Sequence, residues 1–340
     1  MELIEENIIL APFTTLGVGG PARFFSRASS FEDIKRIVKF SKEKKLNLTP
    51  IGGGSNILIS DKGIDGVVVK MELPGMMWDE VDEHSVHLRV FAGEEWDEVV
   101  EESIGNKLYG LENLSGIPGT AGAAPVQNIG AYGVELSDVI SEVEVYDTIE
   151  EERKILKREE CSFEYRGSIF KEEPGRFLII SVTMILSKKP CFVSHYKDIA
   201  ERIEGKEDSL RAVDIRETVL DIRSKKFPDI GSVGSAGSFF KNPVMSVFDF
   251  EKIKKKYPDI PSYPHGSEHV KVPLAWILDK VLNFRGIRSG AVGLFDSQPL
   301  VLVTHGKSTQ TEVSSFAEEI KRKVKDVTNI EIDYEVNFLS

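Results

Sequence analysis

The stretch GLENLSGIPGTAGAAPVQNIGAYGVE, from Gly110 to Glu135, limits the fold more than any other part of the chain. It is poor in charge and rich in glycine, and its apolar residues follow neither the helical nor the strand period. A segment of this length without regular structure, inside a compact domain, is usually either functional or disordered. Its small residues and the single prolines Pro118 and Pro125 indicate order. We therefore expect an ordered, functional loop.

Helix and strand signals lie on both sides of this loop. Ser29 or Ser30 is placed to cap the first predicted helix. Predicted helices begin near Phe31, Glu94, Ala212, Val272 and Ser308. The last strand, over 330–339, is predicted to alternate, with Ile332, Tyr334, Val336 and Phe338 on its apolar face. Because strands and helices mix without regular βαβ alternation, the α+β class is expected.

The length and charge of the chain narrow the possible functions. A chain of 340 residues exceeds what one hydrophobic core usually serves, so two or more domains are expected. The charged segment 200–211, AERIEGKEDSLR, is the best candidate for a boundary. A net charge of −12 argues against nucleic-acid binding, which needs a basic surface. Any anionic ligand therefore needs a local basic cluster.

The cysteines and the hydropathy pattern indicate a compartment. Cys161 and Cys191 are the two cysteines, too few for a disulfide framework in a chain of this length. The N-terminal sequence MELIEENIIL is acidic where a signal peptide would be basic. No stretch approaches the roughly 20 apolar residues of a membrane span. We expect a soluble, cytoplasmic protein without a membrane partner.

The loop IGGGSN, from Ile51 to Asn56, follows a predicted strand. Its three glycines allow tight turns, and their N–H groups could cradle a phosphate. Taken alone, the loop is better explained as a turn between strands, because no G-x-G-x-x-G pattern opens a helix. The sequence HGKST, over 305–309, lacks the first glycine of a P-loop and is interpreted as a helix start.

No metal site is expected. His265 and His269 have the spacing of two ligands on a helix, but Pro264 and Gly266 disfavour a helix at this point. No acidic or cysteine partner stands out near them, so surface histidines are the better interpretation.

The segment GSAGSFFKNP, from Gly234 to Pro243, places Ser238 directly after a flexible Gly-Ala-Gly turn. Basic residues gather around it in the sequence: Arg223, Lys225, Lys226, Lys241, Arg285 and Arg288. Such a cluster in an acidic protein suits an anionic ligand such as a diphosphate, although a solvated basic face is the alternative. Arg166, in the turn YRGSIF, and Glu335, on the polar face of the last strand, are unremarkable alone.

Taken together, these stretches resemble one family closely, the UDP-N-acetylenolpyruvoylglucosamine reductases, or MurB family. The matching pieces run in the family's order over nearly the whole chain: FTTLGVGGPA, IGGGSNILI, GLENLSGIPGTAGAAPVQNIGAYGVEL, ECSFEYRGSIFK, RSKKFPD, GSAGSFFKNP and the final strand with Glu335. The resemblance implies an FAD-binding half of the vanillyl-alcohol-oxidase (PCMH) type, made of two α/β subdomains, and a C-terminal α+β substrate-binding domain. The implied limits are 1–70 and 71–200 for the FAD-binding subdomains, 206–327 for the substrate-binding domain and 328–340 for the C-terminal strand.

The resemblance also implies the cofactor. FAD is expected to bind non-covalently, because no histidine or cysteine in the glycine loops stands out as an anchor. Small residues suit this task because side chains would block close approach of the backbone. The residues implied in cofactor binding are Gly52, Gly53, Gly54, Ser55, Asn56, Ser115, Gly116, Ile117, Pro118, Gly119, Gly122, Ala123, Gln127, Asn128, Gly130, Ala131 and Arg223.

The reaction implied by the resemblance is reduction of an enolpyruvyl ether to a lactyl ether in peptidoglycan precursor synthesis. NADPH first reduces the flavin, and flavin N5 then delivers a hydride to the terminal enol carbon. Negative charge develops on the adjacent carbon and its carboxylate, so electrophilic groups and a proton donor are needed there. By motif match, Arg166 and Glu335 stabilise this charge and Ser238 supplies the proton.

Residues implied in binding the nucleotide-sugar substrate are Tyr132, Tyr196, Lys226, Asn242, Tyr263, Arg285 and Gln298. The segment SHYKDI with Tyr196 suggests the subtype with a tyrosine-bearing lid loop, and a monomer is favoured. Asn337 departs from the family pattern, in which a basic residue often occupies its position.

Two alternative functions are that of another oxidase or dehydrogenase on the same FAD fold, and that of a nucleotide-sugar binder without activity. The intact Ser238, Arg166 and Glu335 disfavour both.

Overall fold

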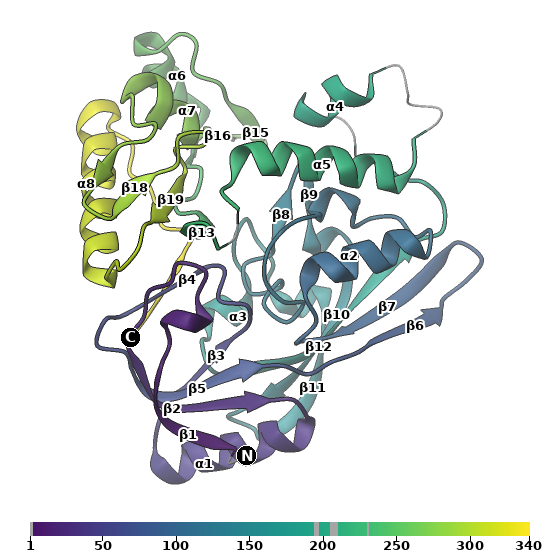
Figure 1. Cartoon of the computed structure of the whole chain (residues 1–340). Helices are drawn as coiled ribbons and strands as arrows, with labels where there is room; N and C mark the ends of the chain where they lie inside the picture. The colour runs from purple at the N-terminus through teal and green to yellow at the C-terminus, as the bar shows by residue number, and fades with distance from the viewer. Residues whose placement is uncertain (1–2, 194–196, 205–209, 230) are drawn as a thin grey trace. The chain divides into compact units, whose positions relative to one another are not determined.

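A computed structural model describes residues 3–193, 197–204, 210–229 and 231–340, and the structural statements below refer to these residues. The chain forms two compact units (Figure 1). Unit 1 comprises Met1–Ile8, Pro21–Gly54 and Ile64–Ser224, and unit 2 comprises Ile9–Gly20, Ser55–Gly63 and Lys225–Ser340. The last division follows Ser224, beyond the charged segment 200–211 in which we expected a boundary.

The first sheet of unit 1 has the strand order β1-β2-β5-β3, and both β2 and β3 run parallel to β5. Its strands are β1 (Ile4–Ile9), β2 (Pro21–Ala28), β3 (Leu48–Ile51) and β5 (Ile64–Met71). Helix α1 (Phe31–Lys44) contacts β2 and β5. The Ser30 hydroxyl accepts a hydrogen bond from the Asp33 N–H and caps this helix, as predicted.

The second sheet of unit 1 is antiparallel, with the order β11-β10-β12-β7-β6. Its strands are β6 (Met76–Glu80), β7 (Ser85–Phe91), β10 (Ile140–Asp147), β11 (Glu152–Lys157) and β12 (Phe177–Ser187). Helix α2 (Trp96–Gly105) buries Trp96, Val99 and Val100 in the core that includes this sheet. The helix predicted to begin near Glu94 is therefore confirmed.

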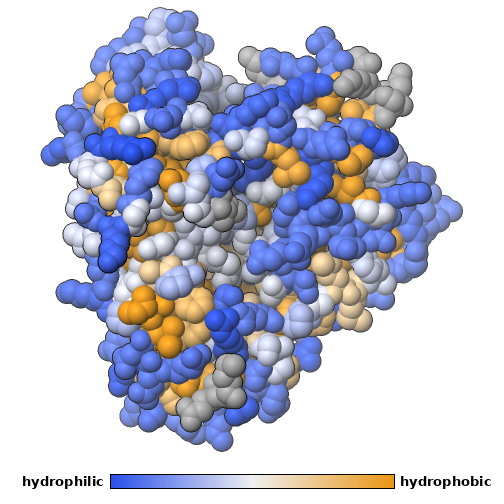
Figure 2. All heavy atoms as spheres, viewed as in Figure 1, coloured by the Kyte–Doolittle hydropathy of each residue, from blue (hydrophilic) through white to orange (hydrophobic). Residues whose placement is uncertain are grey.

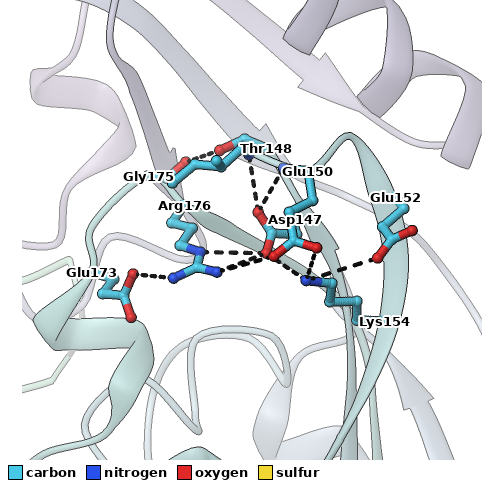
Figure 3. Close-up of polar contacts among 9 residues, drawn as sticks. Asp147, Thr148, Glu150, Glu152, Lys154, Glu173, Gly175 and Arg176 are labelled. Atoms are coloured by element: carbon cyan, nitrogen blue, oxygen red, sulfur yellow. Dashed lines mark hydrogen bonds and ion pairs between the residues drawn. The ribbon is translucent and has the colours of Figure 1, made fainter.

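Asp147 holds the turn between β10 and β11 (Figure 3). Its fully buried carboxylate accepts hydrogen bonds from the N–H groups of Ile149 and Glu150 and forms ion pairs with Lys154 and Arg176. Burial alone would raise the pKa of Asp147, but the hydrogen bonds from Arg176, the Glu150 N–H and Lys154 outweigh it and hold the pKa at about 2. The carboxylate therefore stabilises the turn as a charged group.

The stretch from Gly110 to Glu135 is ordered, as predicted, and consists mainly of turns. Its regular elements are a short 3-10 helix (Glu112–Leu114) and the short strands β8 (Gly130–Ala131) and β9 (Val134–Glu135). Helices α3 (Ile169–Glu172), α4 (Lys197–Ile203) and α5 (Ala212–Lys226) complete unit 1 apart from the last two residues of α5. A small apolar cluster joins α4 and α5 to this stretch and contains Tyr132, Ile199, Ile203, Ile215, Val219 and Ile222.

Unit 2 contains an antiparallel sheet with the order β13-β19-β18-β17. Its strands are β13 (Gly234–Ser238), β17 (Arg288–Ser289), β18 (Val292–Leu294) and β19 (Val301–Thr304). Helix α8 (Gln310–Thr328) contacts β18 and contributes buried residues to the core of this unit. Thr309 and Glu312 form a capping box at its start, which confirms HGKST as a helix start.

Two smaller sheets complete unit 2. One has the order β14-β16-β15 and consists of β14 (Val244–Ser246), β15 (Tyr263–His265) and β16 (His269–Lys271), with α6 (Val247–Lys256) beside it. His265 and His269 pair across the β15–β16 hairpin, so the expectation that they do not share a helix is confirmed. The other sheet pairs β4 (Ile57–Ile59) in parallel with β20 (Asn337–Leu339).

Two predicted elements of unit 2 differ in the structure. The helix expected from Val272 consists of α7 (Leu274–Trp276) followed by a π-helical turn over Ile277–Val281. The strand expected over 330–339 is regular only in β20. The reason is a change of partner: Tyr334 forms an antiparallel bridge with Phe240, whereas β20 runs parallel to β4.

Hydrophilic residues cover most of the face seen in Figure 2, with smaller hydrophobic patches between them. Within the described ranges, no helix combines the length and the apolar character that crossing a membrane requires.

Candidate active site

The glycine loop after β3 lies against the long loop of unit 1. A Cβ atom added to Gly52 would lie 2.4 Å from Oγ1 of Thr120, and one added to Gly53 would lie 2.9 Å from Cα of Gly119. Real Cβ atoms do not approach other atoms this closely, so glycine is required at both positions. IGGGSN therefore is a turn between β3 and β4, as expected, and the two loops implied in FAD binding meet in unit 1.

The backbone around this contact suits an anionic group. Within the part of the chain that the structure describes, the N–H groups of Gly53, Ile117 and Gly119 donate no hydrogen bond. The hydroxyl of Thr120 is buried and also has no partner among these residues. Backbone N–H groups need hydrogen-bond acceptors, and clustered N–H groups of glycine-rich loops bind phosphates. These residues fit the pyrophosphate of a dinucleotide cofactor such as FAD.

Two other residues implied in cofactor binding, Ser115 and Asn128, use their side chains to stabilise the loop. The Ser115 hydroxyl donates to the carbonyl of Glu112 at 2.7 Å. The side chain of Asn128 donates to Glu135 at 2.8 Å and accepts from the Ser137 N–H at 2.9 Å. These two side chains are therefore engaged in holding the loop, and sequence reasoning did not separate this task from ligand contact.

Arg166 adjoins the same loop. Its Nη2 atom donates a hydrogen bond of 2.7 Å to the carbonyl of Gly130. Its φ of +58° lies in the left-handed region, which is uncommon for a residue with a long side chain. Such backbone conformations cluster at functional sites. The structure thus brings together Arg166 and Gly130, which the sequence had assigned to catalysis and to cofactor binding.

Arg223 is a residue of α5, and Tyr132 lies in the loop itself, between β8 and β9. Arg223 Nε donates to the carbonyl of Gly116 at 2.9 Å. Tyr132 is buried in the apolar cluster of α4 and α5, and burial raises the pKa of its hydroxyl in spite of the nearby Arg223. In this structure the ring of Tyr132 packs helices, so its role in substrate binding stays a prediction.

Ser238 ends β13, opposite Val301 of β19. The pairing is irregular between Ser235 and Ser238, and Gly237 has a φ of +69°. A bulge with a left-handed glycine re-aims the following side chain. The expected Gly-Ala-Gly turn is therefore part of a bulged strand. Phe239 and Phe240, the next two residues, are fully buried.

Glu335 is joined directly to the serine segment. Its N–H donates a hydrogen bond of 3.0 Å to the carbonyl of Phe239, the residue that follows Ser238. The N–H of Lys241 donates to the carbonyl of Asp333 at 2.8 Å, which fixes the register of the two segments. Ser238 and Glu335, far apart in the sequence, are therefore neighbours in unit 2, whereas Arg166 belongs to unit 1.

The residues implied in substrate binding have varied surroundings in unit 2. The side-chain carbonyl of Asn242 accepts a hydrogen bond of 2.9 Å from the Leu274 N–H, at the start of α7. Arg285 forms a two-pronged ion pair with Asp279, with Nε 2.6 Å from Oδ1 and Nη2 2.9 Å from Oδ2. Lys226, Tyr263 and Gln298 also lie in unit 2. Tyr196 lies outside the described residues.

Sequence reasoning missed several residues that support these groups. Asp97 and Arg216 lie next to the cofactor loop, and Asp279 is the partner of Arg285. Glu318 accepts a hydrogen bond from Tyr334, beside Glu335. Each looks like an ordinary surface charge in the sequence, so no local signal could have identified it.

Among the described residues, no group of three histidine, cysteine, aspartate or glutamate side chains could hold a metal ion.

Two family models match the chain, one on its N-terminal side and one on its C-terminal side. Residues 22–152 match the family model described as "FAD binding domain". Residues 229–339 match "UDP-N-acetylenolpyruvoylglucosamine reductase, C-terminal domain". The chain is 37% identical over 335 residues to a UDP-N-acetylenolpyruvoylglucosamine reductase of Pseudomonas aeruginosa, covering 98% of both chains. It is 38% identical over 337 residues to that of Porphyromonas gingivalis, covering 99% of both.

The fold has a counterpart among solved structures. The reductase of this family from Thermus caldophilus matches with a TM-score of 0.70 over 99% of both chains, at 23% sequence identity. Together with the two family models, this confirms the α+β class and the predicted combination of a PCMH-type FAD-binding part with a C-terminal domain. The sequence identity over nearly the full length shows that the chain belongs to the UDP-N-acetylenolpyruvoylglucosamine reductase family.

Proposed function

We propose that the chain is an FAD-dependent oxidoreductase of peptidoglycan precursor synthesis. It uses NADPH to reduce UDP-N-acetylglucosamine enolpyruvate to UDP-N-acetylmuramate. The observation that carries this proposal is the hydrogen bond from the Glu335 N–H to the Phe239 carbonyl, because it places two of the three implied catalytic residues side by side. The names of the full-length relatives support the same reaction.

The two glycine loops of unit 1 would hold FAD without a covalent bond. The N–H groups of Gly53, Ile117 and Gly119 would face its pyrophosphate, since they have no acceptor among the described residues. The chemistry that FAD supplies when bound is hydride transfer, from NADPH to the carbon–carbon double bond of the enolpyruvyl group.

Ser238 donates the proton that completes the reduction. An unperturbed hydroxyl is a weak acid, but a carbanion next to a carboxylate is far more basic, so the transfer needs only a short, fixed distance. The bulge in β13 and the buried rings of Phe239 and Phe240 provide that fixed position. Arg166 and Glu335 stabilise the developing negative charge.

The substrate is held by the basic and polar residues of the C-terminal part, with Lys226 and Arg285 facing the diphosphate. Tyr263, Asn242 and Gln298 contact the nucleotide and the sugar, and Tyr132 also contributes to substrate binding. Tyr196 belongs to a tyrosine lid of the family subtype. We propose that the enzyme acts as a cytoplasmic monomer, with FAD-binding subdomains over 1–70 and 71–200, a substrate domain over 206–327 and a catalytic strand over 328–340.

Spectroscopy and a coupled assay test the proposal. The purified protein should be yellow and release FAD on denaturation. NADPH oxidation should require UDP-N-acetylglucosamine enolpyruvate, and the product should be heavier than this substrate by two hydrogen atoms. A colourless protein whose activity does not respond to added FAD would contradict the proposal.

A further inference from the structure

Both backbone polar groups of Gly116 are held by side chains of the protein. Its N–H donates to Oδ1 of Asp97 at 2.5 Å, and its carbonyl accepts from Nε of Arg223 at 2.9 Å. This differs from the neighbouring Ile117 and Gly119, whose N–H groups make no hydrogen bond within the described residues. The backbone of Gly116 therefore anchors the loop to the rest of the protein, whereas the N–H groups of Ile117 and Gly119 are available to bind a ligand.

Asp97 does not act alone. It lies in the first turn of α2, and its carboxylate receives two hydrogen bonds from Arg216 of α5, 2.6 Å from Nη1 to Oδ1 and 2.9 Å from Nη2 to Oδ2. The side chain of Arg216 is only 11% exposed. Paired bonds of this kind fix the angle between the two groups as well as their distance. Arg216 thus holds Asp97 in the orientation that reaches Gly116.

Arg216 and Arg223 are two helical turns apart and lie along the same helix. The helix also touches the loop directly, because a Cβ atom on Gly116 would lie 2.8 Å from Cδ2 of Leu220 and 3.1 Å from Nε of Arg223. With a φ of +69°, Gly116 has a conformation that only glycine adopts easily. Helix α5 therefore binds the carbonyl of Gly116 directly through Arg223, and it reaches the N–H of Gly116 indirectly, through Arg216 and Asp97 of α2.

The charge state of Asp97 agrees with this arrangement. Burial alone would raise the pKa of Asp97, but hydrogen bonds from Arg216 and the Gly116 N–H outweigh it and hold the pKa below its usual range. The carboxylate is therefore ionised at neutral pH and accepts from both donors.

We propose that Asp97 and Arg216 are positioning residues for cofactor binding: through Gly116 they hold the loop so that the N–H groups of Ile117 and Gly119 point at the pyrophosphate. This rests on the proposed binding of FAD. Because these two side chains act on the loop through Gly116, their removal should weaken FAD binding although the N–H groups of Ile117 and Gly119 remain.

The dissociation constant of FAD tests this directly. FAD is removed from the purified enzyme and titrated back, and binding is followed by flavin fluorescence, with far-UV circular dichroism to establish that each variant is folded. Arg216→Gln and Asp97→Ala should each raise the dissociation constant about tenfold, the size expected for a lost hydrogen bond to a charged group. Arg216→Lys, which keeps the charge, should recover part of the affinity.

Two further variants separate positioning from general stability. Arg202→Gln removes an ion pair between α4 and Asp221 of α5 that does not involve the loop, and it should leave the dissociation constant unchanged. The double variant Asp97→Ala/Arg216→Gln should bind FAD no more weakly than Asp97→Ala, because the two residues act through one contact. Unchanged affinity in Arg216→Gln and Asp97→Ala, with a wild-type protein that binds FAD, would overturn the inference. A wild-type protein that does not bind FAD would overturn the proposed function itself.

Discussion

The side-chain amide of Asn56 donates a hydrogen bond of 3.1 Å to the backbone carbonyl of Glu335. The carbonyl of Asn56 in turn accepts from the Asn337 N–H at 3.0 Å, so Asn56 binds the chain on both sides of Val336. On its other edge, Glu335 is bonded to Phe239. The end of the glycine loop, the last strand and the serine segment therefore form one hydrogen-bonded structure around Glu335.

We predict that Asn56→Ala loosens Glu335. The loss of this partly buried hydrogen bond should lower the free energy of unfolding by about 1 kcal/mol. Reoxidation of the reduced enzyme by the enolpyruvyl substrate should slow more than reduction by NADPH, because the role we propose for Glu335 concerns only that substrate. Stopped-flow absorbance of the flavin measures both steps. Asn106→Ala is the matched control, since Asn106 also donates to a backbone carbonyl, that of Glu102, but at the end of α2.

Gly53→Ala tests the contact between the two glycine loops. The new Cβ atom would lie 2.9 Å from Cα of Gly119, and the loops must separate to admit it. We expect a loss of about 1–3 kcal/mol in the free energy of unfolding and markedly weaker FAD binding. Gly105→Ala is the control, because nothing lies within 4 Å of a Cβ atom there. That variant should be about 0.5–1 kcal/mol more stable, since alanine is the better helix residue. Equal effects of the two changes would refute the argument.

Asp147 should make the stability of the protein depend on acid pH (Figure 3). Its pKa is held at about 2 in the folded protein, against about 3.9 in an unfolded chain. A depressed pKa contributes stability above the unfolded value, so about 2 kcal/mol is present above pH ~4 and is lost as the pH falls toward 2. Urea unfolding of Asp147→Asn at several pH values measures this.

The difference in stability between wild type and Asp147→Asn should shrink as the pH falls from 5 to 2. Asp65→Asn is the control, because Asp65 pairs with Arg23 at the surface and its side chain is 85% exposed. Exposed pairs contribute about 0–1 kcal/mol, so that variant should differ little from wild type at any pH. A difference for Asp147→Asn that did not vary with pH would show that the carboxylate is not the stabilising form.

Local sequence patterns predicted most of the elements. The cap at Ser30, the buried face of α2 and the capping box of α8 all depend on residues within a few positions of one another. The irregular loop over 110–135 was also predictable, because its apolar residues follow neither the helical nor the strand period. The last strand was predicted too long, since its alternation could not reveal that Tyr334 and β20 pair with different partners.

The site was predictable only in part. Motifs resembling a known family named Ser238, Arg166 and Glu335, but the bond between Glu335 and Phe239 depends on the register of segments far apart in the chain. Asp97 and Arg216 are 119 positions apart, and neither carries a motif. Asn242 was assigned to substrate binding, and no local pattern indicated that its side-chain carbonyl accepts a hydrogen bond from the Leu274 N–H. Side-chain partners set by tertiary packing leave no local pattern to detect.

The most direct test of the account is to follow Ser238→Ala through the two half-reactions separately. Flavin reduction by NADPH should stay within about twofold of wild type, because no proton from Ser238 is needed. Flavin reoxidation by UDP-N-acetylglucosamine enolpyruvate should fall at least about a hundredfold, the lower range for loss of a general acid. Ser232→Ala, a nearby exposed serine bonded to Asp229, should change neither step. Equal slowing of both steps in Ser238→Ala, or no slowing of reoxidation, would contradict the assignment of Ser238 as the proton donor.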